Sequence, residues 1–478
     1  MKRYGLILAA GKGTRMQTDL PKCAYPILRK PMIEYIVDHM DKSVIDEVVV
    51  VVGHKKEVLE EMLEGRVLFA EQIEQLGTGH AVQAAESILA NKEGSTFIIP
   101  GDVPLVTDVL INKIFAAHDE MGNDLTVVSM IEDYPKGYGR IVRDEYGTIT
   151  GIVEELDLMP HQKEIKEVNT GIYIVNNKIL FDVLKQVKLN ERKKEYYLTD
   201  IVELMHKNYK VNSFVARHPH ETMGVNDLYG ISVAEKYLRE SINKKHMLSG
   251  VSIINPETVT IGQGVIIDKG VVIYPNTTIT GNSYIMQNTT VGPNTEVHNS
   301  IIDENVHVKH SFIFNSKVGE NTTVGPFAHI RENSSIGRNA RIGNYVEIKN
   351  SRIGDDTKIA HLSYVGDSEV GKNVNFGAGS ITVNYDGVLK HKTIIGDNVF
   401  IGCNVNLIAP ISIGDNVFLA AGSTVTKDVP TGSMAIARNQ QVTKEDYYKN
   451  LIKPKPRGIE ERIANKEIKE GFVKKWKY

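Results

Sequence analysis

The sequence has little cysteine, little net charge and no long apolar run, and each shortage excludes a class of protein. Its two cysteines, Cys23 and Cys403, lie far apart in the chain, which excludes a disulfide scaffold and favours a reducing compartment. No apolar stretch is long enough to cross a bilayer, and the run from Leu6 to Ala10 is too short for a signal peptide. The 56 basic and 59 acidic residues give a net charge of −3, so we expect no nucleic-acid partner. These features predict a cytoplasmic protein without membrane insertion.

Apolar residues recur every six positions through most of the C-terminal half. A helix requires a period of 3.6 and a flat strand a period of two, so six fits neither. A short strand followed by a tight turn does fit, and three such flat faces close one coil of a parallel β-helix. Many stacked coils are needed, because burying one Ile or Val stabilises by only about 1.5–3 kcal/mol. The alternative, a β-sandwich with chance periodicity, is disfavoured by the number of cycles. The series run from Ile261 to Val297, from Ile302 to Val308 after a one-residue slip, from Val318 to Ile348 and from Ile395 to Val425.

Other features of this half set the expected domain boundaries. The period breaks around 380–393, which predicts a loop that projects outward from a coil. A polar segment with helical spacing precedes the β-helix. We therefore expect a first domain at 1–227, a linker helix at 228–248, a β-helix at 249–437 and a tail at 438–478. From residue 453 onward the tail is Lys-rich and holds the only tryptophan, Trp476, and we expect it to be partly disordered or amphipathic.

The N-terminal half alternates apolar runs with helical patterns, which is typical of an α/β domain with a mostly parallel sheet. Ligands bind such sheets at the carboxyl ends of the strands. The Gly-rich segment 11–15 falls at one such end, and its Lys12 and Arg15 suit phosphate oxygens. It matches neither a Walker A loop nor Gly-x-Gly-x-x-Gly, so a plain strand-to-helix turn stays an alternative. The expected strands are 4–10, 48–52, 97–99 and 126–128, and the expected helices are 31–42, 55–64, 79–90 and 107–121.

Several motifs of this half occur in the order that a known family shows. The segment 8–16 with Leu20-Pro21-Lys22 resembles the signature of sugar-1-phosphate nucleotidyltransferases. Gln72 and the segment 75–80 resemble the uracil-recognising element of its uridyl members, and Gly101-Asp102-Val103-Pro104 resembles its metal-binding element. The remaining sugar and metal elements match at 138–141, 152–155, 168–171 and 224–226.

Joined to the β-helix, these motifs resemble the bacterial bifunctional N-acetylglucosamine-1-phosphate uridyltransferase and glucosamine-1-phosphate N-acetyltransferase family, from about residue 4 to 445. The resemblance implies an α/β Rossmann-like nucleotidyltransferase domain followed by a left-handed parallel β-helix of hexapeptide repeats. It also implies a homotrimer formed through the β-helix, and a product, UDP-N-acetylglucosamine, that supplies peptidoglycan and other cell-wall precursors.

The first implied reaction joins UTP and N-acetylglucosamine-1-phosphate and releases pyrophosphate. Both substrates are anionic, so catalysis is mostly positioning and charge neutralisation. The resemblance assigns Asp102 and Asn226 as Mg²⁺ ligands, and such hard oxygens suit that ion. It assigns Arg15 and Lys22 to the charge on the triphosphate. The expected contacts to UTP and UDP-N-acetylglucosamine are Leu8, Ala9, Gly11, Lys22, Gln72, Gly77, Thr78, Gly139, Glu154, Asn169 and Asn226.

The second implied reaction acetylates glucosamine-1-phosphate from acetyl-CoA. The amine must lose a proton to attack the thioester, so a general base near neutrality is needed. His361 lies at the family's catalytic position. Arg331 and Lys349 are expected to bind the sugar phosphate, with Tyr364 and Asn375 beside the sugar. The expected acetyl-CoA contacts are Ala378, Asn384, Tyr385, Cys403, Ala421 and Arg438, of which Asn384 and Tyr385 also face the sugar.

The chain departs from the family pattern in four places, and the first of them is expected to have little consequence because Lys22 is present. Cys23-Ala24-Tyr25 follows Lys22 in place of more usual residues, and Arg331-Glu332-Asn333 lacks Pro-Gly, which puts that turn in doubt. Cys403 replaces a small or hydroxyl residue, and Arg438-Asn439-Gln440 lacks a proline. One alternative is a uridyltransferase whose β-helix only trimerises. Others are a non-enzymatic hexapeptide scaffold and a nucleotidyltransferase for another base, as in ADP-glucose synthesis.

Overall fold

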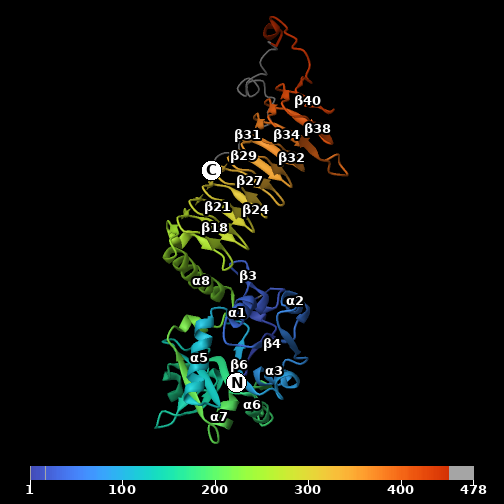
Figure 1. Ribbon diagram of the computed structural model, residues 1–478. Helices are drawn as coiled ribbons and strands as arrows, with labels where there is room; N and C mark the ends of the chain where they lie inside the picture. The colour runs from blue at the N-terminus through green and yellow to red at the C-terminus, as the bar shows by residue number, and fades with distance from the viewer. Residues whose placement is uncertain (1, 17, 452–478) are drawn as a thin grey trace, which may run out of the picture.

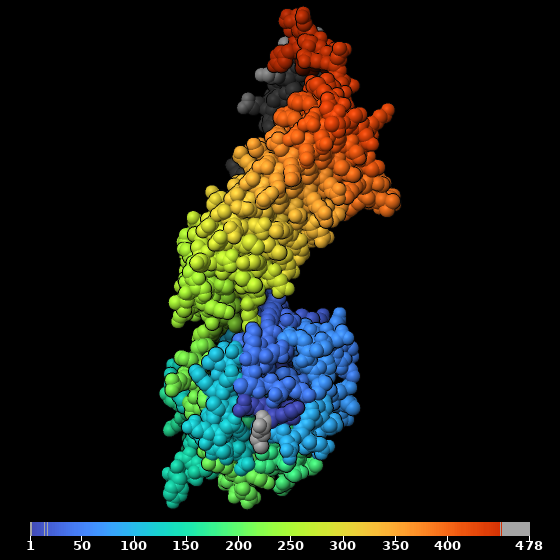
Figure 2. Space-filling model, in the orientation of Figure 1, coloured from blue at the N-terminus to red at the C-terminus, as the bar shows by residue number. Residues whose placement is uncertain are grey.

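The protein consists of an α/β domain and a long β-helix, joined by one helix (Figure 1). The computed structural model describes residues 2–16 and 18–451. The Lys-rich tail after Leu451, with Trp476, lies outside the described residues. The β-helix extends from the α/β domain as a rod (Figure 2). Within the described ranges, no helix combines the length and the apolar character that a membrane span requires.

A nine-stranded mixed sheet forms the centre of the N-terminal domain. Its order is β13-β7-β10-β6-β1-β4-β5, with β8 paired to β10 and β9 paired to β8. Within the seven-strand path only β10 runs antiparallel to its neighbours, and β8 pairs antiparallel with both β10 and β9, so the main path of the sheet is mostly parallel, as predicted. The strands are β1 (Lys2–Leu8), β4 (Glu47–Val52), β5 (Leu68–Glu71), β6 (Gly94–Pro100), β7 (Leu125–Ile131), β8 (Arg140–Arg143), β9 (Ile149–Val153), β10 (Glu167–Asn176) and β13 (Val211–Ala216).

The strand order reverses at β1, which places a crevice beside its carboxyl end. From β1 the chain moves through β4 to β5 on one side, and it returns to place β6 on the other side. Ligands bind such sheets at this switch point. Leu8 and Pro100 end β1 and β6 and pair directly across the ladder. The amide of Gly101 donates to the carbonyl of Leu8 at 2.9 Å, which ties the two loops together.

Helices cover both faces of the sheet and bury two apolar clusters against it. The helix expected at 79–90 is two helices, because the chain turns at Ala85. The helices are α1 (Met32–Asp41), α2 (Lys56–Met62), α3 (Thr78–Ala84), α4 (Glu86–Leu89), α5 (Asp108–Met121), α6 (Asn177–Leu184) and α7 (Asp200–Met205). Short elements are β2 (Pro26–Ile27), β3 (Lys30–Pro31), β11 (Leu189–Asn190), β12 (Glu195–Tyr196), η1 (Thr14–Met16), η2 (Lys22–Ala24), η3 (Glu155–Asp157), η4 (Pro160–Glu164) and η5 (Pro219–Thr222).

Helix α8 (Leu228–Leu248) connects the two domains. Its first turn is capped by Asp227, whose Oδ1 accepts from the amide of Gly230 at 2.8 Å. Near its other end, the buried Nδ2 of Asn243 donates to the carbonyl oxygens of Pro256 and Val259, each at 2.9 Å. An ion pair between Arg29 of the β2–β3 hairpin and Glu296 of the β-helix adds a second link.

The β-helix buries the six-residue period that the sequence shows. Every apolar residue of the four series belongs to one continuous core. One coil is usually 18 residues long, as in the contact between Asn276 and Asn294. The one-residue slip reflects a shorter coil, because Ser300 follows Ser283 in the column after 17 residues. Asparagines occupy many corners at positive φ, such as Asn276 at 57°, a region that Asn tolerates better than most residues.

The coils form one sheet of 19 strands and one of nine. The larger holds β14 (Ser252–Ile253), β15 (Thr260–Ile261), β17 (Val272–Ile273), β18 (Thr277–Thr280), β20 (Thr290–Val291), β21 (Thr295–His298), β23 (His307–Val308), β24 (Phe312–Phe314), β26 (Thr323–Val324), β27 (His329–Ile330), β29 (Arg341–Lys349), β31 (Lys358–Gly366), β33 (Asn375–Phe376), β34 (Ile381–Val383), β36 (Phe400–Ile401), β37 (Asn406–Ile408), β39 (Phe418–Leu419), β40 (Thr424–Val425) and β41 (Met434–Ala435). The smaller holds β16 (Ile266–Ile267), β19 (Tyr284–Ile285), β22 (Ile301–Ile302), β25 (Lys317–Val318), β28 (Ser335–Ile336), β30 (Arg352–Ile353), β32 (Ser368–Val370), β35 (Thr393–Ile395) and β38 (Ile411–Ile413). The turns η6 (Pro256–Thr258) and η7 (Tyr447–Leu451) lie near its two ends.

One coil carries an insertion at the place where the period breaks. Lys372 bonds to Asp397, 25 residues on rather than 18. The extra residues form a projecting loop closed by an antiparallel bridge between Tyr385 and Lys390. Val388 at its tip is 83% exposed. The expected outward loop is therefore present, and it lies beside strands β31 and β34.

Candidate active sites

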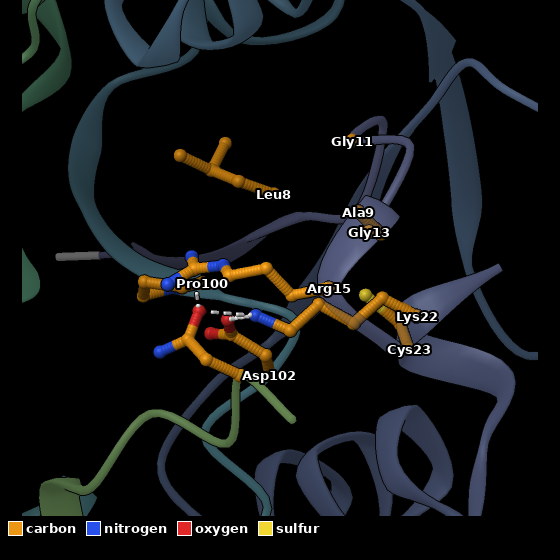
Figure 3. A pocket seen from close by; sticks show the side chains of 10 residues that line it. Leu8, Ala9, Gly11, Gly13, Arg15, Lys22, Cys23, Pro100 and Asp102 are labelled. Atoms are coloured by element: carbon orange, nitrogen blue, oxygen red, sulfur yellow. Dashed lines mark hydrogen bonds and ion pairs between the residues drawn. The ribbon is translucent and has the colours of Figure 1, made fainter. Parts of the chain in front are cut away.

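The first candidate site is a hollow of about 260 Å³ at the carboxyl ends of β1 and β6 (Figure 3). Its position at the switch point follows from the sheet order. The lining residues are Leu8, Ala9, Gly11, Gly13, Arg15, Lys22, Cys23, Pro100, Asp102 and Asn226. The structure thus brings together the seven predicted residues Leu8, Ala9, Gly11, Arg15, Lys22, Asp102 and Asn226.

The Gly-rich loop has its shape because Lys22 crosses it closely. Gly13 has a φ of 60°, and a Cβ there would lie 2.5 Å from Cβ of Lys22. Glycine is therefore required for both conformation and space. The next residue, Cys23, is buried beneath the site, and burial raises the pKa of its thiol to about 12, with Asp102 adding to the shift. Cys23 is thus a protonated packing residue beneath the site.

Two cations and two oxygens meet in this hollow. Nζ of Lys22 forms an ion pair with the Asp102 carboxylate and donates to Oδ1 of Asn226 at 2.8 Å. Arg15 donates to the same Asn226 oxygen at 2.8 Å. The ammonium group of Lys22 therefore contacts an oxygen of Asp102 and an oxygen of Asn226 at the same time. This donor set fits Mg²⁺, which takes few protein oxygens and fills its other positions with water and phosphate. No group of three or more His, Cys, Asp or Glu suited to a metal occurs in the described residues.

A second group of predicted residues lies after β5 and at the start of α3. The side-chain amide of Gln72 donates to the carbonyl of Gly77 at 3.1 Å. Gly77 has a φ of 103°, and a Cβ there would lie 2.6 Å from the carbonyl oxygen of Tyr196. Oγ1 of Thr78 accepts from the amide of Leu198 at 3.0 Å. The segment after β12 therefore holds this loop in place.

A third group consists of Gly139 just before β8, Glu154 just after β9 and Asn169 on β10. The amide of Asn169 donates to the carbonyl of Gly139 at 2.9 Å, and its side chain donates to the hydroxyl of Tyr173 at 2.8 Å. Burial raises the pKa of Glu154, which accepts from the hydroxyl of Thr199 at 3.3 Å. Sequence reasoning did not select Thr199, because nothing in its local pattern indicates a contact with residue 154.

The second candidate site lies on the outer face of the β-helix, where β29 and β31 pair. His361 lies opposite Asn344 in the ladder, and its Nδ1 is 2.9 Å from Oδ1 of Asn344. An amide oxygen only accepts, so Nδ1 carries the hydrogen and Nε2 is left bare. Asn344 was not selected from the sequence. His361 is exposed, so its Nε2 is open to a ligand.

Three cations surround this part of the face. Arg331 donates to Glu347 at 2.8 Å, and its Nε lies 3.7 Å from a carboxylate oxygen of Glu332. Lys349 lies beside Lys390 of the projecting loop, and the neighbouring ammonium lowers the pKa of Lys349, with Arg331 adding to the effect. Mutual repulsion of this kind is relieved by an anion. Lys390 was not selected, although the break in the period indicated its loop.

The structure brings together only some of the predicted sugar contacts. Tyr364 of β31 lies 3.4 Å from Nδ2 of the buried Asn384, which also bonds to Asp367. Asn375 lies on β33 opposite Lys358. Tyr385 points back into its own loop, where its hydroxyl donates to the carbonyl of Gly387 at 2.6 Å. Tyr385 is therefore not gathered with Tyr364 and Asn384 in this structure.

The other predicted acetyl-CoA contacts form one column along a corner of the β-helix. Asn404 donates its amide to the carbonyl of Ala378, and Gly422 donates to that of Cys403, each at 2.8 Å. The guanidinium of Arg438 donates to the carbonyl of Ala421 at 2.7 Å. Ala378, Cys403, Ala421 and Arg438 therefore lie on successive coils, and Cys403 is exposed.

The turn after Arg331 is regular despite its unusual sequence. Asn333 takes a φ of 58°, like Asn315 and Asn350 at the equivalent corners with 45° and 46°. Its amide donates to the carbonyl of Asn315 at 3.1 Å. An asparagine thus provides the left-handed conformation that a Pro-Gly pair would otherwise provide.

Comparisons with known proteins agree with this architecture. The family model described as Nucleotidyl transferase matches residues 4–220. The model described as Bacterial transferase hexapeptide (six repeats) matches residues 392–427, and that of the GMPPB C-terminal domain matches 260–334 and 312–405. The chain is therefore a nucleotidyltransferase joined to a hexapeptide-repeat transferase domain.

Full-length relatives define the family more closely. The chain is 61% identical over 457 residues to the bifunctional protein GlmU of Acholeplasma laidlawii, covering 96% of this chain and 99% of that protein. It is 44% identical over 456 residues to GlmU of Listeria monocytogenes, covering 94% and 99%. It is 45% identical over 453 residues to GlmU of an Exiguobacterium strain, covering 94% and 100%. The chain belongs to the bifunctional GlmU family.

Proposed function

We propose that the chain makes UDP-N-acetylglucosamine in two reactions, acetylation of glucosamine-1-phosphate and then uridyl transfer to N-acetylglucosamine-1-phosphate. The carrying observation is that one chain holds two separate clusters of cationic side chains with different additional groups. The hollow pairs Arg15 and Lys22 with the oxygens of Asp102 and Asn226. The β-helix face pairs a cluster of cations with the open imidazole of His361.

Acetyl transfer at the β-helix needs a base and an anion site. Arg331, Lys349 and Lys390 would bind the phosphate of glucosamine-1-phosphate. Nε2 of His361 would take a proton from the substrate ammonium group, and the amine nitrogen would attack the thioester carbon of acetyl-CoA. The C–S bond then breaks, and the sulfur leaves as CoA with a proton. The corner column from Ala378 to Arg438 would hold the CoA moiety.

Uridyl transfer in the hollow needs charge neutralisation more than proton transfer. A phosphate oxygen of N-acetylglucosamine-1-phosphate attacks the α-phosphorus of UTP, and pyrophosphate leaves. Arg15 and Lys22 would neutralise the triphosphate and its developing charge. Asp102 and Asn226 would hold Mg²⁺, which supplies positive charge to the phosphates when bound.

Two further groups of residues would contact the base and the sugar. Gln72, Gly77 and Thr78 would contact the uracil, and the group of Glu154 and Asn169 would contact the sugar. We further propose a homotrimer formed through the β-helix and a cytoplasmic location. Oligomer formation is typical of hexapeptide repeats, and the two unpaired cysteines suit a reducing compartment.

Two products test the proposal. The protein is incubated with Mg²⁺, UTP, acetyl-CoA and glucosamine-1-phosphate, and free CoA and pyrophosphate are followed separately. Release of both supports two sites, and release of neither by folded protein overturns both assignments. Asp102→Ala should stop pyrophosphate release and spare CoA release. If this variant keeps near-normal uridyl transfer, the metal assignment is wrong.

One observation favours a second candidate, a uridyltransferase whose β-helix is only a scaffold. The guanidinium of Arg331 is paired with Glu347 and lies near Glu332, and these carboxylates compete with a phosphate. In that case CoA never appears, and pyrophosphate appears only when N-acetylglucosamine-1-phosphate is supplied.

A further inference from the structure

The side-chain amide of Gln72 is held by two partners. Its Nε2 lies 3.1 Å from the carbonyl oxygen of Gly77 and 3.1 Å from Nδ1 of His80. Gln72 is only 4% exposed, and a buried N–H without a partner is unfavourable, so both hydrogen bonds matter. His80 lies in the first turn of α3, where the amide of Ala81 also donates to Gly77 at 3.1 Å.

The Gly77 carbonyl determines which way the amide faces. A carbonyl oxygen can only accept, so the atom beside it must be the NH₂ group of Gln72 and not its oxygen. The second hydrogen of that NH₂ group then points to Nδ1 of His80. Nδ1 must therefore be the bare nitrogen, and the hydrogen of the neutral ring is on Nε2.

With both hydrogens used, only Oε1 of Gln72 is left for a ligand. Across residues 2–16 and 18–451 no donor forms a hydrogen bond with this oxygen. It is also not among the fully buried polar atoms that lack a partner, so it is open to a ligand. Gln72 thus presents an acceptor alone. Uracil has a donor, N3–H, on its pairing edge, whereas cytosine has a bare nitrogen at the same place.

We propose that His80 is a positioning residue that fixes the Gln72 amide and thereby selects a base with a ring N3–H. The inference rests on the proposed uridyl transfer, in which Gln72 faces the base. Gly77 can accept only one of the two hydrogens of the NH₂ group, so the orientation of the amide depends on His80 as well. Base selection is therefore assigned to Gln72 and His80 together. Without His80 the other hydrogen has no partner, and the amide is free to turn away.

Two substitutions of His80 test the proposal on the full-length enzyme. His80→Leu keeps most of the volume and removes the acceptor. His80→Asn keeps an acceptor, because Oδ1 of asparagine lies as many bonds from Cα as Nδ1 of histidine. The measurements are kcat and KM for UTP and for CTP from pyrophosphate release. CoA release by the β-helix site reports folding in each variant.

For His80→Leu we expect KM for UTP to rise about tenfold with kcat within about twofold, and the UTP-to-CTP ratio of kcat/KM to fall about tenfold, as loss of one hydrogen bond predicts. His80→Asn should recover most of both losses. Wild-type KM and ratio in His80→Leu would overturn the proposal. Equal loss in both variants, with kcat lowered as well, would instead assign His80 to packing. If the wild-type protein releases no pyrophosphate from UTP, the proposed uridyl transfer itself fails, and this inference fails with it.

Discussion

We predict that the hydrogen bond between Asn344 and His361 contributes measurably to the rate of the proposed acetyl transfer. Oδ1 of Asn344 accepts from Nδ1 of His361 at 2.9 Å, and this contact selects the tautomer with a bare Nε2. Asn344→Ala removes the acceptor, and the exposed ring then samples the other tautomer and other orientations. Neither residue belongs to the buried core, so folding should change little.

The expected magnitude follows from the bond that is lost. A neutral hydrogen bond contributes about 0.5–1.5 kcal/mol, which corresponds to a decrease in kcat of about 2- to 12-fold. Removal of the base in His361→Ala should cost about 10²- to 10⁴-fold. Asn344→Asp keeps an oxygen in the same place and should retain activity within a few-fold.

The assay follows free CoA thiol with saturating acetyl-CoA and glucosamine-1-phosphate. Pyrophosphate release from UTP and N-acetylglucosamine-1-phosphate serves as the control in the same preparations. Full acetyl transfer in Asn344→Ala would refute the positioning role. A His361→Ala enzyme with more than about a tenth of the activity would refute the base assignment. Equal loss of both activities in a variant would indicate misfolding.

Three further predictions address the remaining contacts. Gly13→Ala should lower uridyl transfer at least tenfold, because a left-handed alanine costs about 1–2 kcal/mol and its Cβ would displace Lys22. Pyrophosphate release measures this loss, and CoA release should stay unchanged. Burial and nearby carboxylates raise the pKa of Asp200 from 3.8 to about 6, so its stabilising contribution is complete below pH 3.8 and is lost as the pH rises through 6. Asp200→Asn should therefore raise the free energy of unfolding by about 1–2 kcal/mol at pH 8 and not at pH 4, a magnitude already reduced for the partial exposure of this side chain. Thermal unfolding of both proteins across this pH range measures the difference, and a difference that does not change with pH contradicts the prediction. Lys390→Met should raise KM for glucosamine-1-phosphate about tenfold with little change in KM for acetyl-CoA, since it removes one cation of the proposed phosphate site beside Lys349.

The β-helix could be predicted from the sequence because its determinant is local. Each inward Ile or Val fills its own place on a flat face, so the period is visible without any knowledge of distant contacts. The slip at Ile302 and the break after Val370 appeared in the sequence for the same reason, as a shortened coil and a projecting loop. The α/β domain was predicted less completely, because strands such as β8 and β13 mix apolar with polar or charged residues and lack continuous apolar runs.

The site residues that could not be selected from the sequence share one physical feature. Asn344 meets His361 only because β29 and β31 pair in one register, and slips elsewhere in the β-helix prevent that register from being counted from the sequence. Lys390 reaches Lys349 from an insertion whose path no period describes. Thr199 reaches Glu154 across two elements of the α/β domain. In each case the chemistry depends on a contact between segments whose spacing is not repeated.

The two candidate sites differ in how much of their surroundings one chain provides. In the hollow, Lys22 and Asn226 are held by side-chain contacts from several elements, as expected at the switch point of a sheet. On the β-helix, the inner face is used entirely by the core, so His361, Tyr364 and Lys349 stand on an outer face with only the projecting loop beside them. Thioester aminolysis benefits from a site that excludes water. A second copy of the chain against this face, as in the proposed trimer, would provide the wall that a single β-helix cannot form.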